Sequence, residues 1–362
     1  MKYIDEFRDP RLAKALVESI KRGAGDHPLR FMEVCGTHTV AIFRSGVRQL
    51  IGGAVDLLSG PGCPVCVTAQ PDIDHAIGLA EVPEVTLATF GDMVKVPGTR
   101  GSLQEARARG ADVRIVYAAS DAVRLAEANP SRHVVFLGVG FEATAPTIAA
   151  AVIEAKRRRL ENFSVFSLHK LVPPALRALL DSGETHLDGL LLPGHVSTII
   201  GEEPYRFLDK DHGLPAVITG FEPLDVLQGI EALVAMARAG NTRLANRYAR
   251  AVRPEGNPAA LRMMAEVFEP ADSDWRGLGC LPGSGLALRE TYAAHDAARA
   301  FRVDVAYSHE PAGCACGAVL RGAAMPTQCA LFAGACTPER PVGPCMVSTE
   351  GTCAAYYAYG RE

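Results

Sequence analysis

The chain has 362 residues, of which 48% are hydrophobic and 22% charged, and its formal net charge is −4. This length predicts two or three domains with a large core, and the small negative charge gives no basis for nucleic-acid binding. No stretch reaches the roughly 20 apolar residues that a membrane-spanning helix needs, and the charged first 22 residues do not resemble a secretory signal, so we expect a cytoplasmic protein.

Strands and helices are predicted to alternate along the chain. Residues 5–22 are expected to form a helix, because their apolar side chains recur at helical spacing. Short apolar runs that end in glycine-rich or polar loops predict strands at 29–34, 54–58, 85–89, 113–117, 133–137, 163–168, 187–192 and 216–219. Helical segments are expected between most of them, at 72–80, 120–128, 147–159 and 174–182. This alternation predicts α/β structure with parallel sheets that are covered on both faces.

The predicted elements fall into three domains. Gly-Phe-Glu follows a predicted strand twice, at 140–142 and at 220–222, which indicates two α/β lobes of related build. We assign residues 1–130 to the first lobe and residues 131–223 to the second. Beyond Gly220 the sequence changes character, so residues 224–362 are predicted to form a third domain, mainly helical and irregular.

Polar residues follow three of the predicted strands directly. Cys35 and His38 lie in Cys-Gly-Thr-His-Thr after the first strand, and Cys63 and Cys66 lie in Gly-Pro-Gly-Cys-Pro-Val-Cys after the second. His195 lies in Pro-Gly-His-Val-Ser after the seventh. Ligands of open parallel sheets bind outside the carboxyl ends of the strands, so these residues are the candidate site.

The residues alone leave the chemistry of this site open. Cys63 and Cys66, as a C-x-x-C pair, are a redox pair, a metal site or two packed thiols. Together with Cys35 and His38 they would complete a Cys3His zinc set. His195 is a candidate general acid or base, or a histidine that is hydrogen-bonded at a turn.

The C-terminal tail holds six of the ten cysteines, between Cys314 and Cys353. Thiols at this density indicate disulfides, zinc or an iron–sulfur cluster. A reducing compartment disfavours disulfides, and the tail lacks the paired C-x(2–4)-C knuckles of structural zinc sites. Its long, irregular intervals favour an iron–sulfur cluster, although they do not decide which four of the six cysteines bind it.

Five stretches of the chain resemble the HypD family of hydrogenase maturation factors: MEVCGTHT, GPGCPVCVT, FGDMVKVPG, LPGHVSTIIG and the tail CACG…QC…CTPERPVGPCMVSTEGTCAAYY. The resemblance covers nearly the whole chain. No cysteine position departs from it.

The resemblance implies a function and partners. Family members work with the small protein HypC to assemble the Fe(CN)2CO unit of [NiFe]-hydrogenase, and cyanide arrives from a thiocyanate on HypE, which HypF charges. By this likeness Cys35 holds the iron under assembly, opposite a cysteine of HypC. Cys63 and Cys66 would be a nearby redox pair or further iron ligands. By motif position, His38 would position the incoming ligand or donate to the Cys35 sulfur, and His195 would line the same cleft.

The resemblance also implies a resident [4Fe-4S] cluster in the third domain. The family pattern places its ligands at Cys314, Cys329, Cys336 and Cys353. Cys316 and Cys345 remain candidates for a disulfide or for thiols beside the cluster.

Three functions remain to be distinguished. In the first, a cluster that supplies single electrons and a Cys63/Cys66 dithiol that stores two together drive the reductive removal of cyanide from a thiocyanate. In the second, the chain is an iron–sulfur-dependent protein disulfide oxidoreductase that uses Cys63 and Cys66, and Cys35 is dispensable. In the third, it is a zinc-stabilised binding module without redox chemistry.

Overall fold

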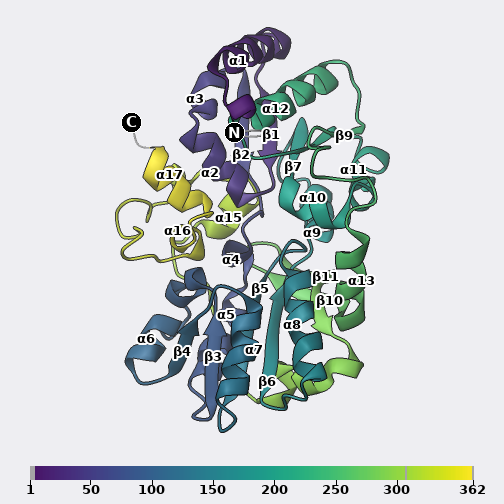
Figure 1. The fold of residues 1–362 in the computed structure, drawn as a ribbon. Helices are drawn as coiled ribbons and strands as arrows, with labels where there is room; N and C mark the ends of the chain where they lie inside the picture. The colour runs from purple at the N-terminus through teal and green to yellow at the C-terminus, as the bar shows by residue number, and fades with distance from the viewer. Residues whose placement is uncertain (1–4, 306–307, 361–362) are drawn as a thin grey trace.

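The computed structural model describes residues 5–305 and 308–360, and two parallel β-sheets dominate its fold (Figure 1). Helices separate most consecutive strands of each sheet, so the predicted α/β class with parallel sheets is confirmed. Within these residues, no helix is both long and apolar enough to cross a membrane.

The first sheet contains five parallel strands in the order β2-β1-β7-β8-β9. The strands are β1 (Leu29–Glu33), β2 (Val55–Ser59), β7 (Gly189–Pro193), β8 (Ala216–Thr219) and β9 (Leu244–Asn246). Its helices are η1 (Asp5–Phe7), α1 (Pro10–Ala24), α2 (Gly36–Arg44), α3 (Val47–Ile51), α10 (Gly194–Ile200), η3 (Glu203–Tyr205), α11 (Phe207–Lys210) and α12 (Pro223–Arg238). The register aligns Glu33 with Ser59, so the loops after β1 and β2 leave the sheet side by side.

The second sheet contains four parallel strands in the order β4-β3-β5-β6. The strands are β3 (Val85–Thr89), β4 (Asp112–Ile115), β5 (His133–Gly140) and β6 (Phe163–His169). Around it lie α5 (Gln70–Ala80), η2 (Gly91–Lys95), α6 (Leu103–Ala108), α7 (Ala119–Ala128), α8 (Ala145–Arg157), α9 (Val172–Asp181), α13 (Pro258–Val267), η4 (Glu290–His295) and α14 (Ala297–Ala300).

Alternate residues of each strand pack into different cores. On β7, Leu191 packs with residues of α1 and α12, whereas Leu190 and Leu192 face a core that the two sheets share. On β3, Leu87 faces the shared core and Ala88 faces α7 and α8. Both faces of each sheet are therefore buried, which explains why these strands are almost continuously apolar.

The first helix begins later than its apolar spacing predicts. η1 covers only Asp5–Phe7, and α1 begins at Pro10. The Asp9 side chain accepts the N–H of Arg11, and Pro10 occupies the first turn, where a missing N–H costs nothing. This local capping, rather than the apolar pattern, sets the boundary.

An antiparallel hairpin lies where the sequence predicted irregular structure. β10 (Phe268–Trp275) pairs with β11 (Gly279–Leu288), and the hairpin packs against α9 and β6. Its turn reaches the short helix α4 (Pro64–Val67), where the N–H of Arg276 donates to the carbonyl of Val67 at 2.9 Å. The hairpin thus connects the second sheet to the Cys63/Cys66 loop.

The two sheets do not coincide with the predicted lobe ranges. β1 and β2 pair in one sheet with β7 and β8, whereas β3 and β4 pair with β5 and β6 in the other. Within residues 224–362, α12 packs on β7 and β8, and the β10–β11 hairpin packs on β6. The chain therefore passes to the second sheet after β2 and returns to the first after β6.

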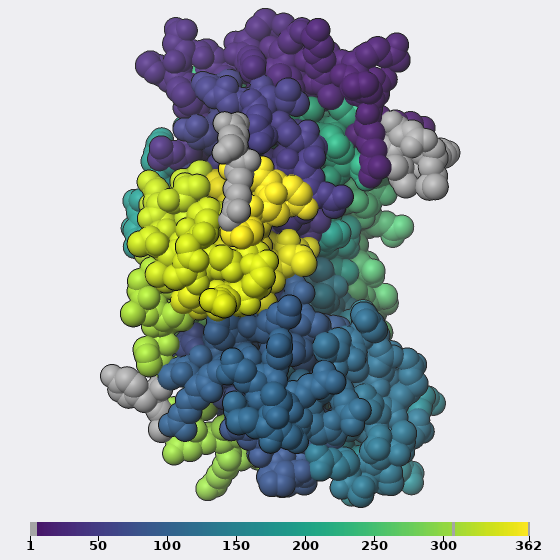
Figure 2. Space-filling model, turned by 90° about the vertical axis from the view of Figure 1, so that its left-hand side faces the viewer, coloured from purple at the N-terminus to yellow at the C-terminus, as the bar shows by residue number. Residues whose placement is uncertain are grey.

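The tail is helical and irregular, as predicted, and it lies against both parts of the molecule. It contains α15 (Cys316–Leu320), η5 (Pro326–Gln328), α16 (Pro344–Val347) and α17 (Thr352–Tyr359). α17 contacts α2, and α16 contacts α4. Figure 2 shows the tail in yellow between the purple N-terminal part and the blue second-sheet part.

Candidate functional site

Cys35 lies at the junction of β1 and α2, as the N-cap residue of that helix. Its thiol is 7% exposed and faces the N–H groups of His38 and Thr37. Burial and the charge of Glu350 raise the pKa of Cys35 to about 12, and the N–H groups act in the opposite direction. The free thiol is therefore protonated, and a bound cation is needed to hold it as a thiolate.

Glycines allow the Cys35 loop and the Cys63 loop to touch. The N–H of Gly36 donates to the carbonyl of Gly62 at 3.0 Å. A Cβ atom on Gly62 would lie 2.3 Å from the backbone nitrogen of Cys35, so no larger residue fits there without movement of the backbone. The structure thus brings together the two loops that the sequence placed at adjacent strand ends.

Cys63 and Cys66 are buried free thiols on one turn of chain. Cys63 is the N-cap residue of α4, and its sulfur accepts the N–H of Cys66 at 3.3 Å. Burial raises the pKa of Cys66 well above its ordinary value. The two sulfurs therefore have different surroundings, as the two thiols of a redox pair do.

The rings of His38 and His195, two predicted site residues, pack against the ring of Phe221, a residue that the sequence analysis did not select. The ring centroid of Phe221 lies 4.6 Å from that of His38 and 4.0 Å from that of His195. His38 is fully buried, and its Nε2–H donates to the carbonyl of Gly220 at 2.9 Å. Burial lowers the pKa of His38 to about 4, so its Nδ1, which has no partner among the described residues, is a free acceptor. His195 is solvent-accessible, and partial burial lowers its pKa.

Glu350 is a residue of the tail that sequence reasoning missed. Its Oε1 accepts a hydrogen bond from the Thr37 hydroxyl at 2.6 Å, and its charge acts on both Cys35 and His195. The only sequence signal was its place in Ser-Thr-Glu-Gly-Thr-Cys, three residues before Cys353. The tail therefore contributes a carboxylate to the Cys35 loop.

The same stretch of tail also contacts the second sheet. Asp92, in η2 directly after β3, accepts hydrogen bonds from the hydroxyl of Ser348 at 3.1 Å and from the N–H of Thr349 at 3.4 Å. Residues 348–350 thus bridge the loops of both sheets beside Cys35.

The four predicted cluster ligands line one small cavity in the tail. Its walls are Cys314, Cys316, Cys329, Cys336 and Cys353, with the apolar side chains of Ala315, Leu331, Phe332 and Met346. In the described part of the chain, no three His, Cys, Asp or Glu side chains are grouped so that they could hold a metal ion. A cubane cluster binds each thiolate through a different iron and does not need such a group. The all-sulfur donor set in an apolar cavity fits a [4Fe-4S] cluster.

Cys345 connects this cavity with the Cys63/Cys66 pair. Its thiol is fully buried and lies beside the thiols of Cys316, Cys353 and Cys66, and its pKa is raised well above the ordinary value, chiefly by Cys316. Cys316 itself packs on Gly343, where a Cβ atom would lie 2.6 Å from its sulfur. Contacts between thiols therefore connect Cys66, through Cys345, with the cysteines of the tail cavity. All ten cysteines are free thiols.

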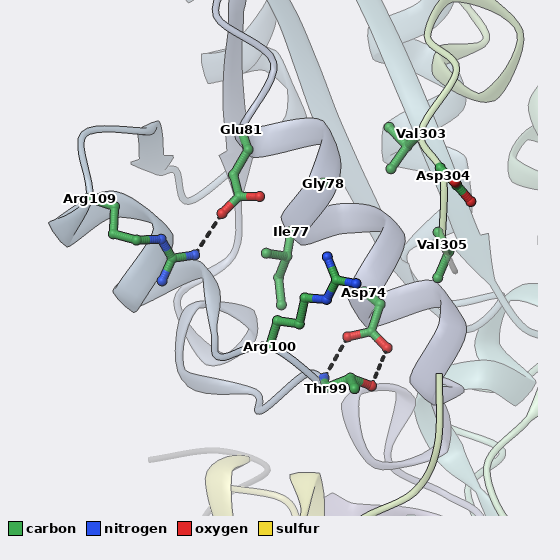
Figure 3. Close-up of a pocket in the computed structure, with 10 residues that line it drawn as sticks. All are labelled: Asp74, Ile77, Gly78, Glu81, Thr99, Arg100, Arg109, Val303, Asp304 and Val305. Carbon is green, nitrogen blue, oxygen red and sulfur yellow. Dashed lines mark hydrogen bonds and ion pairs between the residues drawn. The ribbon is translucent and has the colours of Figure 1, made fainter. Parts of the chain in front are cut away.

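An open pocket of about 320 Å³ lies apart from these thiols, between α5 and residues 303–305 (Figure 3). Asp74 in this pocket accepts hydrogen bonds from the N–H and the hydroxyl of Thr99, both at 2.6 Å. Glu81 pairs with Arg109 at 2.6 Å. None of the described residues that line the pocket is a cysteine or histidine, so we do not include it in the candidate site.

Three relatives define the class of this protein. The chain is 47% identical to "Hydrogenase maturation factor HypD" of Rhodobacter capsulatus, over 99% of this chain and 98% of the relative. It is 47% identical to "Hydrogenase expression/formation protein HupD" of Azotobacter chroococcum mcd 1 (100% and 98%) and 44% identical to the HypD factor of Escherichia coli K12 (100% and 99%). The protein is therefore a hydrogenase maturation factor. The HypD family model, described as "Hydrogenase formation hypA family", matches residues 11–360, and the chain belongs to this family.

Proposed function

We propose that this chain assembles the Fe(CN)2CO unit of [NiFe]-hydrogenase in the cytoplasm and holds the iron under assembly on Cys35. In this proposal HypC supplies the opposite cysteine, and HypE delivers cyanide as a thiocyanate. Iron that carries cyanide and carbon monoxide favours soft thiolate donors. The buried position of Cys35, which needs a cation to become a thiolate, supports this role.

The observation that carries the proposal is the continuity of the thiols. The Cys35 loop packs on the loop that leads to Cys63, and Cys66 contacts Cys345 at the edge of the tail cavity. The proposed iron ligand, the dithiol and the all-sulfur cavity are therefore contiguous, which supports reductive ligand transfer between them.

Transfer of cyanide from a thiocyanate breaks an S–C bond and takes up two electrons. The Cys63/Cys66 dithiol provides both electrons when it closes to a disulfide and releases two protons. One proton goes to the sulfur of the donor, cyanide binds the iron as an anion, and the other proton leaves to solvent. A [4Fe-4S] cluster bound by Cys314, Cys329, Cys336 and Cys353 would then return the Cys63/Cys66 disulfide to the dithiol by supplying two electrons, one at a time. His38, whose Nδ1 has no partner among the described residues, is the candidate to position the incoming ligand.

Infrared spectroscopy of the anaerobic complex with HypC tests this proposal. We expect Cys35→Ala to lose the cyanide and carbonyl bands because the iron is no longer held. Cys63→Ala should keep the brown colour and labile sulfide of the tail cluster but lose the cyanide bands. The matched control is Cys280→Ala, since Cys280 is exposed on the β10–β11 hairpin and should leave all bands unchanged. Normal cyanide bands in Cys63→Ala would exclude the electron-storing role of the pair.

The contact between Cys66 and Cys345 also favours the second function, an iron–sulfur-dependent protein disulfide oxidoreductase. The two proposals differ at Cys35, which disulfide reduction does not need. Reduction of a protein disulfide by Cys35→Ala at the wild-type rate, together with unchanged hydrogenase maturation, would favour the oxidoreductase.

A further inference from the structure

The largest fully buried side chain among the described residues is a cation, Arg276, which is 1% exposed. It lies in the turn between β10 and β11. Its Nε donates to the carbonyl of Thr68 at 3.2 Å, and its Nη2 donates to Oε1 of Gln70 at 2.9 Å. Its ion-pair partner is Glu310, 3.9 Å from Nη1 and 46% exposed. The guanidinium is therefore buried against neutral acceptors and one distant, solvent-screened carboxylate.

Such a burial is costly, and local structure does not require it. A buried charge without a close counter-charge is unfavourable. The backbone already holds the turn in place, because the N–H of Arg276 donates to the carbonyl of Val67 and Trp275 forms an isolated antiparallel β-bridge with Thr68. The hydrogen bonds of Arg276 require N–H donors but not a full positive charge, so a further counter-charge nearby would explain the buried cation.

The turn of Arg276 lies between the two thiol groups of the proposed function. Thr68 and Gln70 directly follow the Cys63/Cys66 helix in sequence. On the other side, a Cβ atom on Gly277 would lie 2.5 Å from the Cα of Gly317, the residue after Cys316. Cys316 in turn lines the tail cavity, together with the four proposed cluster ligands.

We propose that Arg276 is the buried counter-charge of the tail cluster and that it raises the reduction potential of this cluster. A [4Fe-4S] cluster with four thiolate ligands is negatively charged, and reduction adds one more negative charge. A fixed cation in a dry interior stabilises the reduced form more than the oxidised form. This inference rests on the proposed cluster and adds to it the residue that sets the ease of its reduction.

The test is the midpoint potential of the cluster in the anaerobically reconstituted full-length protein, followed by electron paramagnetic resonance. In Arg276→Met we expect the ratio of reduced to oxidised cluster at a fixed potential to fall at least tenfold, which is about 59 mV for a one-electron couple. Arg276→Lys keeps the charge, so its ratio should stay within about threefold of wild type, well inside a tenfold effect. A bound cluster with an unchanged potential in Arg276→Met would overturn the inference.

The matched control is Arg321→Met. Arg321 donates to the carbonyl of Gly277 in the same turn, but its side chain is 26% exposed and pairs with Glu184 at 2.7 Å. Its charge is therefore already compensated and screened, and we expect no tenfold shift. A purely structural role of Arg276 would instead lower the melting temperature of both Arg276 variants and leave the potential in place.

A second variant keeps the inference testable if Arg276→Met does not bind the cluster. Gln70→Glu places a carboxylate where Nη2 of Arg276 already donates, so it neutralises the guanidinium in its native position. The reduced fraction should fall, as in Arg276→Met, and an unchanged potential would overturn the inference. A wild-type protein without iron and labile sulfide would overturn both the proposed cluster and this inference. A wild-type protein that binds the cluster, with a potential that neither variant shifts, would overturn this inference and leave the cluster proposal standing.

Discussion

Two buried histidines and two buried carboxyl groups give the core opposing responses to pH. Burial lowers the pKa of His38 to about 4 and that of His169 to about 3. Each histidine gains a proton only on unfolding, so its stabilisation is present above its ordinary pKa of 6.5 and is lost as the pH falls from there towards the folded value. Burial raises the pKa of Glu33 to about 8 and that of Glu142 to about 7, so stabilisation by these groups is lost as the pH rises from 4.5 through those values.

These opposing responses can be separated by isosteric substitution. When the pH falls from 7 to 5, the free energy of unfolding of the wild type should decrease by about 2 kcal/mol through His169. His169→Gln should not show this decrease. Over the same interval the free energy of unfolding of the wild type should rise by about 2 kcal/mol through Glu142, and Glu142→Gln should not show this rise. Urea unfolding at the two pH values measures both effects. Equal pH dependence in wild type and His169→Gln would show that His169 titrates normally in the folded protein.

At the level of single residues, the sequence indicated the cysteines, whose side chains are reactive and uncommon. It did not indicate residues whose role depends on contacts between distant segments. Cys35 and the Cys63/Cys66 pair were placed at neighbouring strand ends by their loops alone, and the structure brings those loops together. Glu350 reaches Thr37 across 313 positions of sequence, so no local pattern could indicate the contact. Phe221 was visible only as part of Gly-Phe-Glu, and its role depends on where two histidines lie in space.

At the level of elements, the apolar strands were predictable and the hairpin was not. β3 and β8 have the predicted bounds because fully buried strands are apolar throughout. β10 reads Phe-Glu-Pro-Ala-Asp-Ser-Asp-Trp and is buried chiefly at its two ends. A strand with so few apolar residues and an internal proline resembles a loop in sequence, and only its pairing with β11 makes it a strand.

The hairpin turn gives a matched pair of substitutions. Gly277 and Gly279 both have positive φ, 79° and 77°, but a Cβ atom on Gly277 would strike Gly317 whereas one on Gly279 would meet nothing within 4 Å. Both alanine variants should suffer backbone strain, and Gly277→Ala should lose about 1–3 kcal/mol more because of the clash. Limited proteolysis should then cut the tail faster in Gly277→Ala than in Gly279→Ala. Equal cleavage rates would show that the turn does not support the tail.

At the level of the whole molecule, the tail forms hydrogen bonds with segments that follow strands of both sheets, beside Cys35. Glu350 bonds to Thr37 on the first-sheet side, and Asp92 holds Ser348 and Thr349 on the second-sheet side. The order of pairing that creates this arrangement was beyond sequence reasoning. Each strand was recognisable, but which strands pair depends on contacts between distant segments, so ranges drawn along the chain could not reproduce two interleaved sheets.

Removal of the Asp92 carboxylate tests whether these hydrogen bonds hold the tail. Asp92→Ala deletes the acceptor for one hydroxyl and one N–H group, so amide hydrogens of residues 348–353 should exchange several-fold faster. Asp211→Ala is the control, because Asp211 forms an exposed ion pair with Arg177 on another part of the surface. Unchanged exchange in Asp92→Ala would mean that Glu350 and the packing of α17 hold the tail without help from the second sheet.

The interleaving of the sheets also fixes an order of events during translation. All four strands of the second sheet lie between residues 85 and 169, so this sheet can close while β7 is still unmade. β1 gains its second neighbour only when β7 leaves the ribosome, and the tail that covers Cys35 is synthesised last. Until then, the three thiols that the finished protein buries lie at the edge of an unfinished sheet. The nascent chain therefore passes through a period in which its own fold does not yet shield Cys35, Cys63 and Cys66 from oxidation.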